Sequence, residues 1–192
     1  MRANFSRAIL VTVSVALLTL GTHKTATAQE PASQATVTSA DETWTWIQDR
    51  ITRFGRATKF DRDGKVLASK TCKAVSRNGC ELVLRDELVL PTYRQQIEFT
   101  VPLDALDPSR VEAKQGGEPL PFWYVTLRAT GDARRVSMKV LSFDNSKAKG
   151  IVPGDSVEAS VSIPCADRET AERLAKAFVH FITLCGGKRE PF

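Results

Sequence analysis

Histidine is scarce in this chain, and this scarcity narrows the catalytic chemistry that the sequence supports. Only His23 and His180 occur among 192 residues, and His23 lies in a segment that we expect to be cleaved. A Ser-His-Asp triad, a Cys-His pair or a histidine-rich metal site would therefore have to use His180. The Gly-x-Ser-x-Gly motif of serine hydrolases is missing, as is a glycine-rich phosphate loop. We expect a protein that is not an enzyme and that holds no cofactor and no metal.

Long runs of one charge and long apolar runs are missing as well. Basic residues cluster only in short groups such as Arg134-Arg135, whereas nucleic-acid-binding proteins usually carry a basic stripe. The net charge of +5 falls to +2 once Arg2, Arg7 and Lys24 leave with the N-terminal segment, because no acid leaves with them. The longest apolar stretch is shorter than the about 20 residues that span a bilayer. The sequence predicts no nucleic-acid partner and no transmembrane anchor.

The first 28 residues have the composition of an export signal. Arg2 and Arg7 precede an apolar run over residues 9–20, and Ala26-Thr27-Ala28 forms a small-x-small cleavage site. We therefore predict a signal peptide over residues 1–28 and a mature protein that starts near Gln29 and is periplasmic or secreted. Residues 29–38 are polar and lack periodicity, which is typical of a flexible lead-in. Residues 39–192 are enough for one domain with a substantial core.

All four cysteines, Cys72, Cys80, Cys165 and Cys185, follow the predicted signal peptide. Because an exported chain matures where disulfides persist, two disulfides are the default prediction. Cys165 and Cys185 flank a predicted helix whose ends lie about 30 Å apart, too far for a bridge between them. Full pairing would therefore join the region of Cys72 and Cys80 to the two ends of this helix. The spacings do not fit the C-x(2–4)-C pairs of structural zinc sites.

A local bridge from Cys72 to Cys80 is the alternative, and it would leave the other two cysteines as buried thiols. Asn78-Gly79 favours a two-residue hairpin turn. Such a turn would place Cys80 opposite Arg77 and Cys72 opposite Arg85, which opposes the local bridge. This register favours pairing between strand and helix without eliminating the local bridge.

The chain after the lead-in starts with a predicted helix. Ser39 stands three residues before Glu42, as in a capping box. Trp44, Ile47, Ile51 and Phe54 then follow at helical spacing, and Gly55 ends the pattern. Trp46 lies off this apolar stripe, so we expect it to be half-exposed or to pack on a second surface.

From about residue 57 to residue 163 the dominant period is two. Residues 97–103, 136–140 and 156–163 alternate between apolar and polar side chains, and Gly, Pro, Asn and Asp mark turns between such segments. This pattern is typical of half-buried antiparallel strands. We predict about seven strands that form a strongly bent sheet or a barrel.

Residues 167–184 return to a helical period. Ala171, Leu174, Phe178 and Ile182 form an apolar stripe, and Gly186-Gly187 provides a C-terminal cap. This amphipathic helix needs a surface to cover, and the open end of the bent sheet is the expected one.

A seven-stranded antiparallel barrel closed by a C-terminal helix resembles the pleckstrin-homology-like superfold. The tail Cys-Gly-Gly-Lys-Arg-Glu-Pro-Phe over residues 185–192 is similar to the ends of small exported bacterial proteins of unknown function. The resemblance implies a fold and a compartment, and it brings no active site. A calycin-type barrel is the alternative fold, although the Gly-x-Trp opening of lipocalins is missing.

The predicted strand that begins at Phe122-Trp123-Tyr124 offers a candidate contact surface. If Trp123 faces the core, Phe122 and Tyr124 point to the other side of the strand. Two outward aromatic rings would form a contact patch. The alternative is that the N-terminal helix and Trp44 cover them.

These observations favour a non-catalytic binding module for a peptide, a protein or a small ligand. Such a fold offers an exposed sheet edge, loops at its open end, or a groove beside the helix. One alternative is a carboxylate-dependent hydrolase that uses acids such as Asp61, Asp63 or Glu87. A structural, envelope-associated protein is another.

Overall fold

The computed structural model describes residues 39–117, 120–145 and 154–189. The predicted signal peptide and the lead-in lie outside the described residues, as do the last residues of the tail. In the part of the chain that is described, no helix is long and apolar enough to cross a membrane.

Helix α1 (Ala40–Phe54) begins and ends where the sequence predicts. The Ser39 hydroxyl accepts a hydrogen bond from the Glu42 amide at 3.1 Å, and the Glu42 carboxylate accepts one from the Ser39 amide at 2.8 Å. This reciprocal pair confirms the capping box. Gly55 ends the helix, and a Cβ at this position would lie 2.4 Å from the Ile51 carbonyl oxygen. Only glycine therefore fits here without a shift of the backbone.

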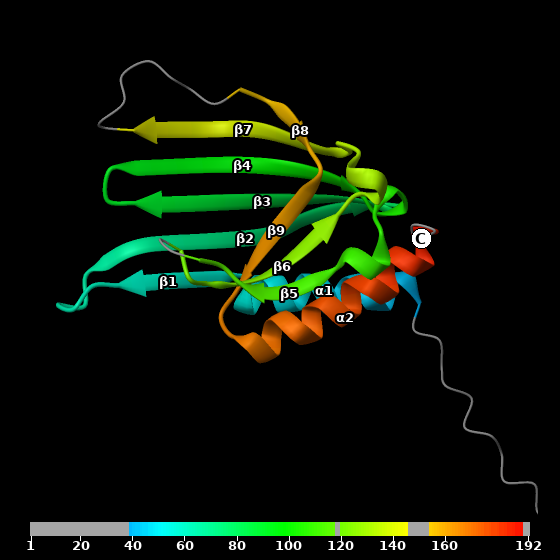
Figure 1. The fold of residues 1–192 in the computed structure, drawn as a ribbon, viewed down its shortest axis with the longest axis horizontal. Helices are drawn as coiled ribbons and strands as arrows, with labels where there is room; N and C mark the ends of the chain where they lie inside the picture. The colour runs from blue at the N-terminus through cyan, green and yellow to red at the C-terminus, as the bar shows by residue number, and fades with distance from the viewer. Residues whose placement is uncertain (1–38, 118–119, 146–153, 190–192) are drawn as a thin grey trace, which may run out of the picture. The chain divides into compact units, whose positions relative to one another are not determined.

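The larger sheet has six strands, each antiparallel to its neighbours, in the order β1-β2-β3-β4-β7-β8. The strands are β1 (Arg56–Phe60), β2 (Val66–Asn78), β3 (Glu81–Leu90), β4 (Tyr93–Pro102), β7 (Val136–Asn145) and β8 (Ser156–Glu158). Figure 1 shows the first four as successive hairpins, with the β1–β2 turn at the far left.

A second antiparallel sheet has three strands in the order β5-β6-β9. These are β5 (Glu112–Gln115), β6 (Trp123–Arg128) and β9 (Ser160–Cys165). One residue, Ala159, separates β8 from β9, so the chain passes directly from the larger sheet into the smaller one (Figure 1). Three short 3-10 helices, η1 (Leu103–Ala105), η2 (Pro108–Arg110) and η3 (Thr130–Asp132), connect the strands.

The fold confirms the mainly β class and the antiparallel pairing, but it corrects two details. The described residues form nine strands instead of about seven, and the sheets do not close into a barrel. β5 has four residues, which is too short for alternation to be recognised, and the alternating segment 156–163 divides into β8 and β9 at Ala159. The barrel stays open because the chain leaves the larger sheet at Ala159 and completes a separate sheet.

Helix α2 (Arg168–Leu184) matches the C-terminal helix of the prediction. Its core-facing stripe is buried and consists of Ala171, Leu174, Ala175, Phe178, Phe181 and Ile182. The two helices run antiparallel. The ring centroid of Trp44, near the start of α1, lies 6.4 Å from that of Phe181, near the end of α2. At the other end the Ala166 amide donates to the Phe54 carbonyl oxygen at 3.0 Å. Each large buried side chain contributes about 1.5–3 kcal/mol of hydrophobic stabilisation.

Candidate functional site

A pocket of about 160 Å³ lies where the end of α1 meets the beginning of α2. We call this pocket the helix groove. Its α1 side consists of three residues at helical spacing, and its α2 side belongs to the first turns of that helix. The lining residues are Trp46, Arg50, Phe54, Asp167, Glu169, Thr170 and Arg173.

Arg50 is the central residue of the α1 side. Its guanidinium carbon lies 5.2 Å from the ring centroid of Trp46 and 5.6 Å from that of Phe54, so two cation–π contacts hold it. Its Nε atom is buried and finds no hydrogen-bond acceptor among the described residues. An orphaned buried donor is costly, and the Arg50 guanidinium therefore offers a hydrogen-bond donor that the described residues around it do not satisfy.

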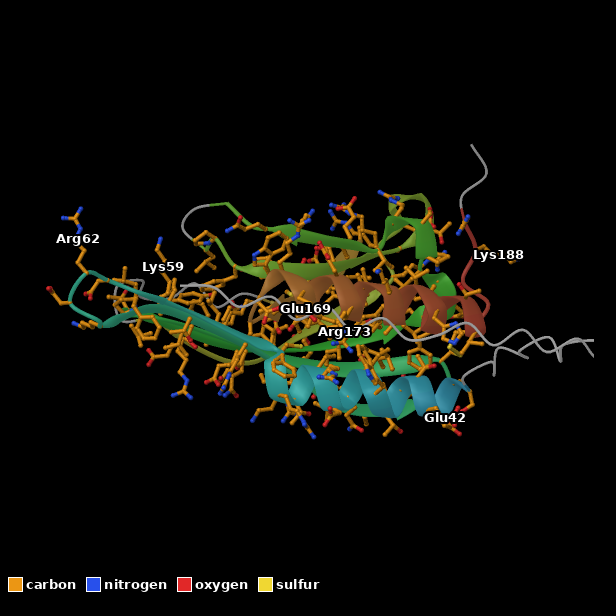
Figure 2. The ribbon with its side chains drawn as sticks, turned by 90° about the horizontal axis from the view of Figure 1, so that it is seen from below. Glu42, Lys59, Arg62, Glu169, Arg173 and Lys188 are labelled. Carbon is orange, nitrogen blue, oxygen red and sulfur yellow. A yellow bond between two sulfur atoms is a disulfide. The ribbon has the colours of Figure 1, made fainter. Side chains whose placement is uncertain are left out.

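The acids on the α2 side of the helix groove already have partners. Asp167 caps α2, since its carboxylate accepts a hydrogen bond from the Thr170 amide at 2.7 Å. Glu169 lies 3.6 Å from the guanidinium of Arg173, one turn further along the helix, and both side chains are labelled on α2 in Figure 2. Arg50, in contrast, makes no ion pair among the described residues of this site, and its Nε–H is the donor that is left without an acceptor.

A second polar cluster lies inside the molecule, on β2 and β3. The Lys70 ammonium is 3.0 Å from the Asp86 carboxylate, and Cys72 is the direct cross-strand partner of Asp86. The Lys70 nitrogen also lies 5.4 Å from the ring centroid of Tyr124, on β6. This cluster therefore bridges the two sheets.

Burial and the Lys70–Asp86 ion pair together shift the pKa values of this cluster. Burial alone would lower the pKa of Lys70, but the charge and hydrogen bond of Asp86 outweigh it and raise that pKa. Burial raises the pKa of Asp86 despite the opposing effect of Lys70, and it raises the pKa of the Cys72 thiol well above its ordinary value. We attribute a structural role to this buried ion pair, because its partners lie on adjacent strands and pair with each other.

The four cysteines form one disulfide instead of two. Cys80 is bonded to Cys185, with Cα atoms 5.6 Å apart, which confirms a bridge between the hairpin region and the end of α2. Cys72 and Cys165 are buried free thiols, so the second predicted bridge is wrong. Burial raises the pKa of Cys165 to about 12.

The predicted register of the cysteine hairpin is also wrong. Asn78 pairs with Glu81, so the two-residue turn is Gly79-Cys80, with Gly79 at a φ of 58°. A β-bulge between Ala74 and Ser76 shifts the pairing again, and Cys72 consequently faces Asp86. Because Cys80 lies in the turn itself, its side chain is able to reach the end of α2.

Neither ring of the predicted contact patch lies on an open surface. Phe122 is 7% exposed, and Tyr124 is half-buried beside Lys70. Gly116 permits this position of Tyr124, since a Cβ at Gly116 would lie 2.7 Å from the ring. Lys70 of β2 therefore packs against Tyr124, whereas Trp44 packs on α2.

The acids considered for a hydrolase have separate partners. The Asp61 carboxylate accepts hydrogen bonds from the amides of Asp63 and Lys65, at 2.9 and 2.8 Å, and so stabilises the β1–β2 turn. Glu87 pairs with Arg94 at 2.8 Å, and this hydrogen bond lowers the pKa of Glu87. Asp61 and Asp63 therefore lie together in the β1–β2 turn, whereas Glu87 lies on β3 with its own partner. Among the residues that are described, no group of three or more metal-ligating side chains occurs.

Arg50 and Lys70 were not recognised as candidates from the sequence, whereas Asp86 was considered only as a carboxylate pair with Glu87. Trp46 carried a signal, because it lies off the apolar stripe of α1 and its helical neighbours at steps of four are Arg50 and Phe54.

No protein-family model, curated protein or solved structure matches the chain.

Proposed function

We propose that this protein is an exported, non-catalytic binding module that takes an acidic group of a peptide or protein partner in the helix groove. The observation that carries this proposal is the guanidinium of Arg50 between Trp46 and Phe54, whose buried Nε–H has no acceptor among the described residues. A carboxylate would accept charge-assisted hydrogen bonds from this guanidinium.

The size of the helix groove indicates what fits. Its volume is about 160 Å³. Sites for drug-sized ligands and cofactors are larger, at about 300–1,000 Å³. One acidic side chain or one chain terminus therefore fits, and most of the affinity for a longer partner would come from contacts outside the groove.

Two features support the wider proposal. The Cys80–Cys185 disulfide is compatible with an exported protein. An antiparallel sheet with a C-terminal helix packed beside it is also the arrangement expected from the resemblance to the pleckstrin-homology-like superfold, and we keep this resemblance as part of the proposal.

The proposal is tested by NMR with two small probes that differ in one group. N-acetylglycine carries a free carboxylate, and N-acetylglycinamide has a neutral amide in its place. We expect N-acetylglycine to shift the Arg50 Nε–H and Trp46 indole N–H resonances in a saturable manner. The amide should have little effect, because it does not balance the charge.

Substitutions at neighbouring positions of α1 provide the control. Arg50→Met keeps the length of the side chain and should weaken N-acetylglycine binding at least about tenfold, since hydrogen bonds to charged groups contribute about 1.5–3 kcal/mol. Arg53→Met removes an exposed arginine that is paired with Asp49 at 2.7 Å and should leave binding unchanged. Equal responses to both probes, or equal losses in both variants, would refute the proposal.

A further inference from the structure

The end of the β1–β2 hairpin exposes three large apolar side chains close together. Phe60 is 57% exposed, Val66 44% and Leu67 37%, and Phe60 and Val66 are cross-strand partners. We call residues 60–67 the hairpin tip. The other exposed large apolar residues of the described chain occur singly on β2, β7, β8 and α2. Single exposed residues are ordinary, whereas such a group on a protruding element indicates a contact surface.

Basic residues accompany these apolar side chains. Residues 56–67 contain four basic and two acidic residues, which gives this segment a net charge of +2. One of the two acids, Asp61, is already engaged with backbone amides of the turn. Figure 2 shows Arg62 at the outermost point of the hairpin and Lys59 further back on the same arm. Within the hairpin tip the two basic and two acidic residues balance, so the net positive charge comes from Arg56 and Lys59 on β1. The β1–β2 arm therefore combines apolar surface at its tip with positive charge behind it.

The edge of β1 is poorly suited to the addition of another strand. β1 has five residues, and it carries Arg56 and Lys59. A β-bulge interrupts its pairing at Phe60. Short length, basic side chains and bulges are the features by which edge strands resist pairing. The apolar side chains consequently need a partner that does not extend the sheet.

We propose that the hairpin tip binds the surface of an anionic lipid bilayer, with Phe60, Val66 and Leu67 entering the interfacial region and Arg62 and Lys65 contacting lipid phosphates. The tip is a projecting arm at the left of Figure 1 instead of a groove, and a bilayer accepts a convex apolar surface. Basic residues add attraction to anionic headgroups. This surface is separate from the helix groove, so it extends the proposed function without depending on it.

Vesicle co-sedimentation tests the proposal with the full folded protein. We expect binding to vesicles that contain phosphatidylglycerol and much weaker binding to phosphatidylcholine alone. The triple substitution Phe60→Thr, Val66→Thr and Leu67→Thr should lower the partition coefficient at least about tenfold, from the lost apolar burial. Arg62→Gln with Lys65→Gln should lower it roughly tenfold or more on the anionic vesicles only.

A matched triple variant at other exposed apolar positions serves as the control. Val75→Thr, Leu141→Thr and Val157→Thr change three other large apolar side chains that are also exposed, and they should leave vesicle binding unchanged. Arg50→Met should also leave vesicle binding unchanged. This variant therefore separates the test of the hairpin tip from the test of the helix groove. A thermal midpoint like that of the parent protein establishes that each variant is folded.

Three results would overturn the proposal. The first is an absence of binding to the anionic vesicles, and the second is an equal loss in both triple variants. The third is self-association of the parent protein without lipid that the hairpin-tip variant abolishes, because the hairpin tip would then bind a second copy of the chain instead of a membrane.

Discussion

Removal of the Cys80–Cys185 disulfide is the perturbation whose effect the structure defines best. The bridge joins residues 105 positions apart, so it closes a loop that includes most of the described fold. In the chain-entropy model, a loop of about 100 residues corresponds to about 4.7 kcal/mol of stability at 25 °C, and a loop of about 15 residues to about 3 kcal/mol. We therefore expect Cys80→Ser with Cys185→Ser to lower the free energy of unfolding by about 4 kcal/mol.

Urea denaturation followed by tryptophan fluorescence measures this loss. For a domain of this size, about 4 kcal/mol corresponds to a fall of roughly 10 °C in the thermal midpoint. A reducing agent should shift the parent protein to the curve of the double variant and leave the variant itself unchanged. The control is Cys72→Ala with Cys165→Ala, whose cost arises from packing and does not depend on the reducing agent.

Two results would refute this reasoning. A loss below about 1 kcal/mol in the double serine variant would mean that closing the long loop adds little stability, contrary to the entropic model. A mass of the non-reduced protein that shows two disulfides would mean that Cys72 and Cys165 pair as well, against the free thiols of the structure.

Three further predictions concern the interior. Lys70→Met should destabilise the fold by about 3 kcal/mol, because it leaves the Asp86 carboxylate buried without its partner. The additional change Asp86→Leu should restore most of the lost stability. Urea denaturation of both variants measures the two free energies of unfolding. The pKa of Lys70 is raised above its ordinary value of 10.5. The contribution of Lys70 to the free energy of unfolding is therefore complete below pH 10.5 and declines as the pH rises through the folded-state pKa. In that pH range the stability of the parent protein should fall more than that of the Lys70→Met, Asp86→Leu variant. Cys72 and Cys165 should resist alkylation by iodoacetamide at neutral pH in the native protein and react in urea, because burial raises the pKa of both thiols. Mass spectrometry measures the modification. Rapid modification of the native protein would contradict the buried placement of these cysteines.

The two helices were predictable from the sequence because local signals define them. The capping box at Ser39 and Glu42 and the close contact at Gly55 specify α1 without any tertiary information. In α2, the apolar residues are spaced so that one face is buried, and the structure confirms that stripe. Signals of this kind act within a few residues, and this is why the helix boundaries agree with the prediction.

The arrangement of the strands was less predictable because it depends on single residues. The shifted turn and the bulge between Ala74 and Ser76 together move Cys72 from the predicted position opposite Arg85 to one opposite Asp86. The shift of the turn by one residue places Cys80 where it meets Cys185. A shift of this size leaves the alternating pattern intact, so periodicity does not reveal it. The helix groove escaped prediction for a related reason, since it requires two helices that are distant in sequence to meet.

The structure holds the two ends of α2 differently, and this bears on the proposed binding site. At the C-terminal end, a covalent bond between Cys185 and Cys80 ties the helix to the β2–β3 turn. At the N-terminal end, the Asp167 cap and the hydrogen bond from Ala166 to Phe54 provide the attachment. Binding segments usually belong to the less stable parts of a fold, and the helix groove lies at this non-covalent end. A ligand bound to the native protein would add stability through mass action, and we expect the gain in protection from hydrogen exchange to be concentrated in the first turns of α2.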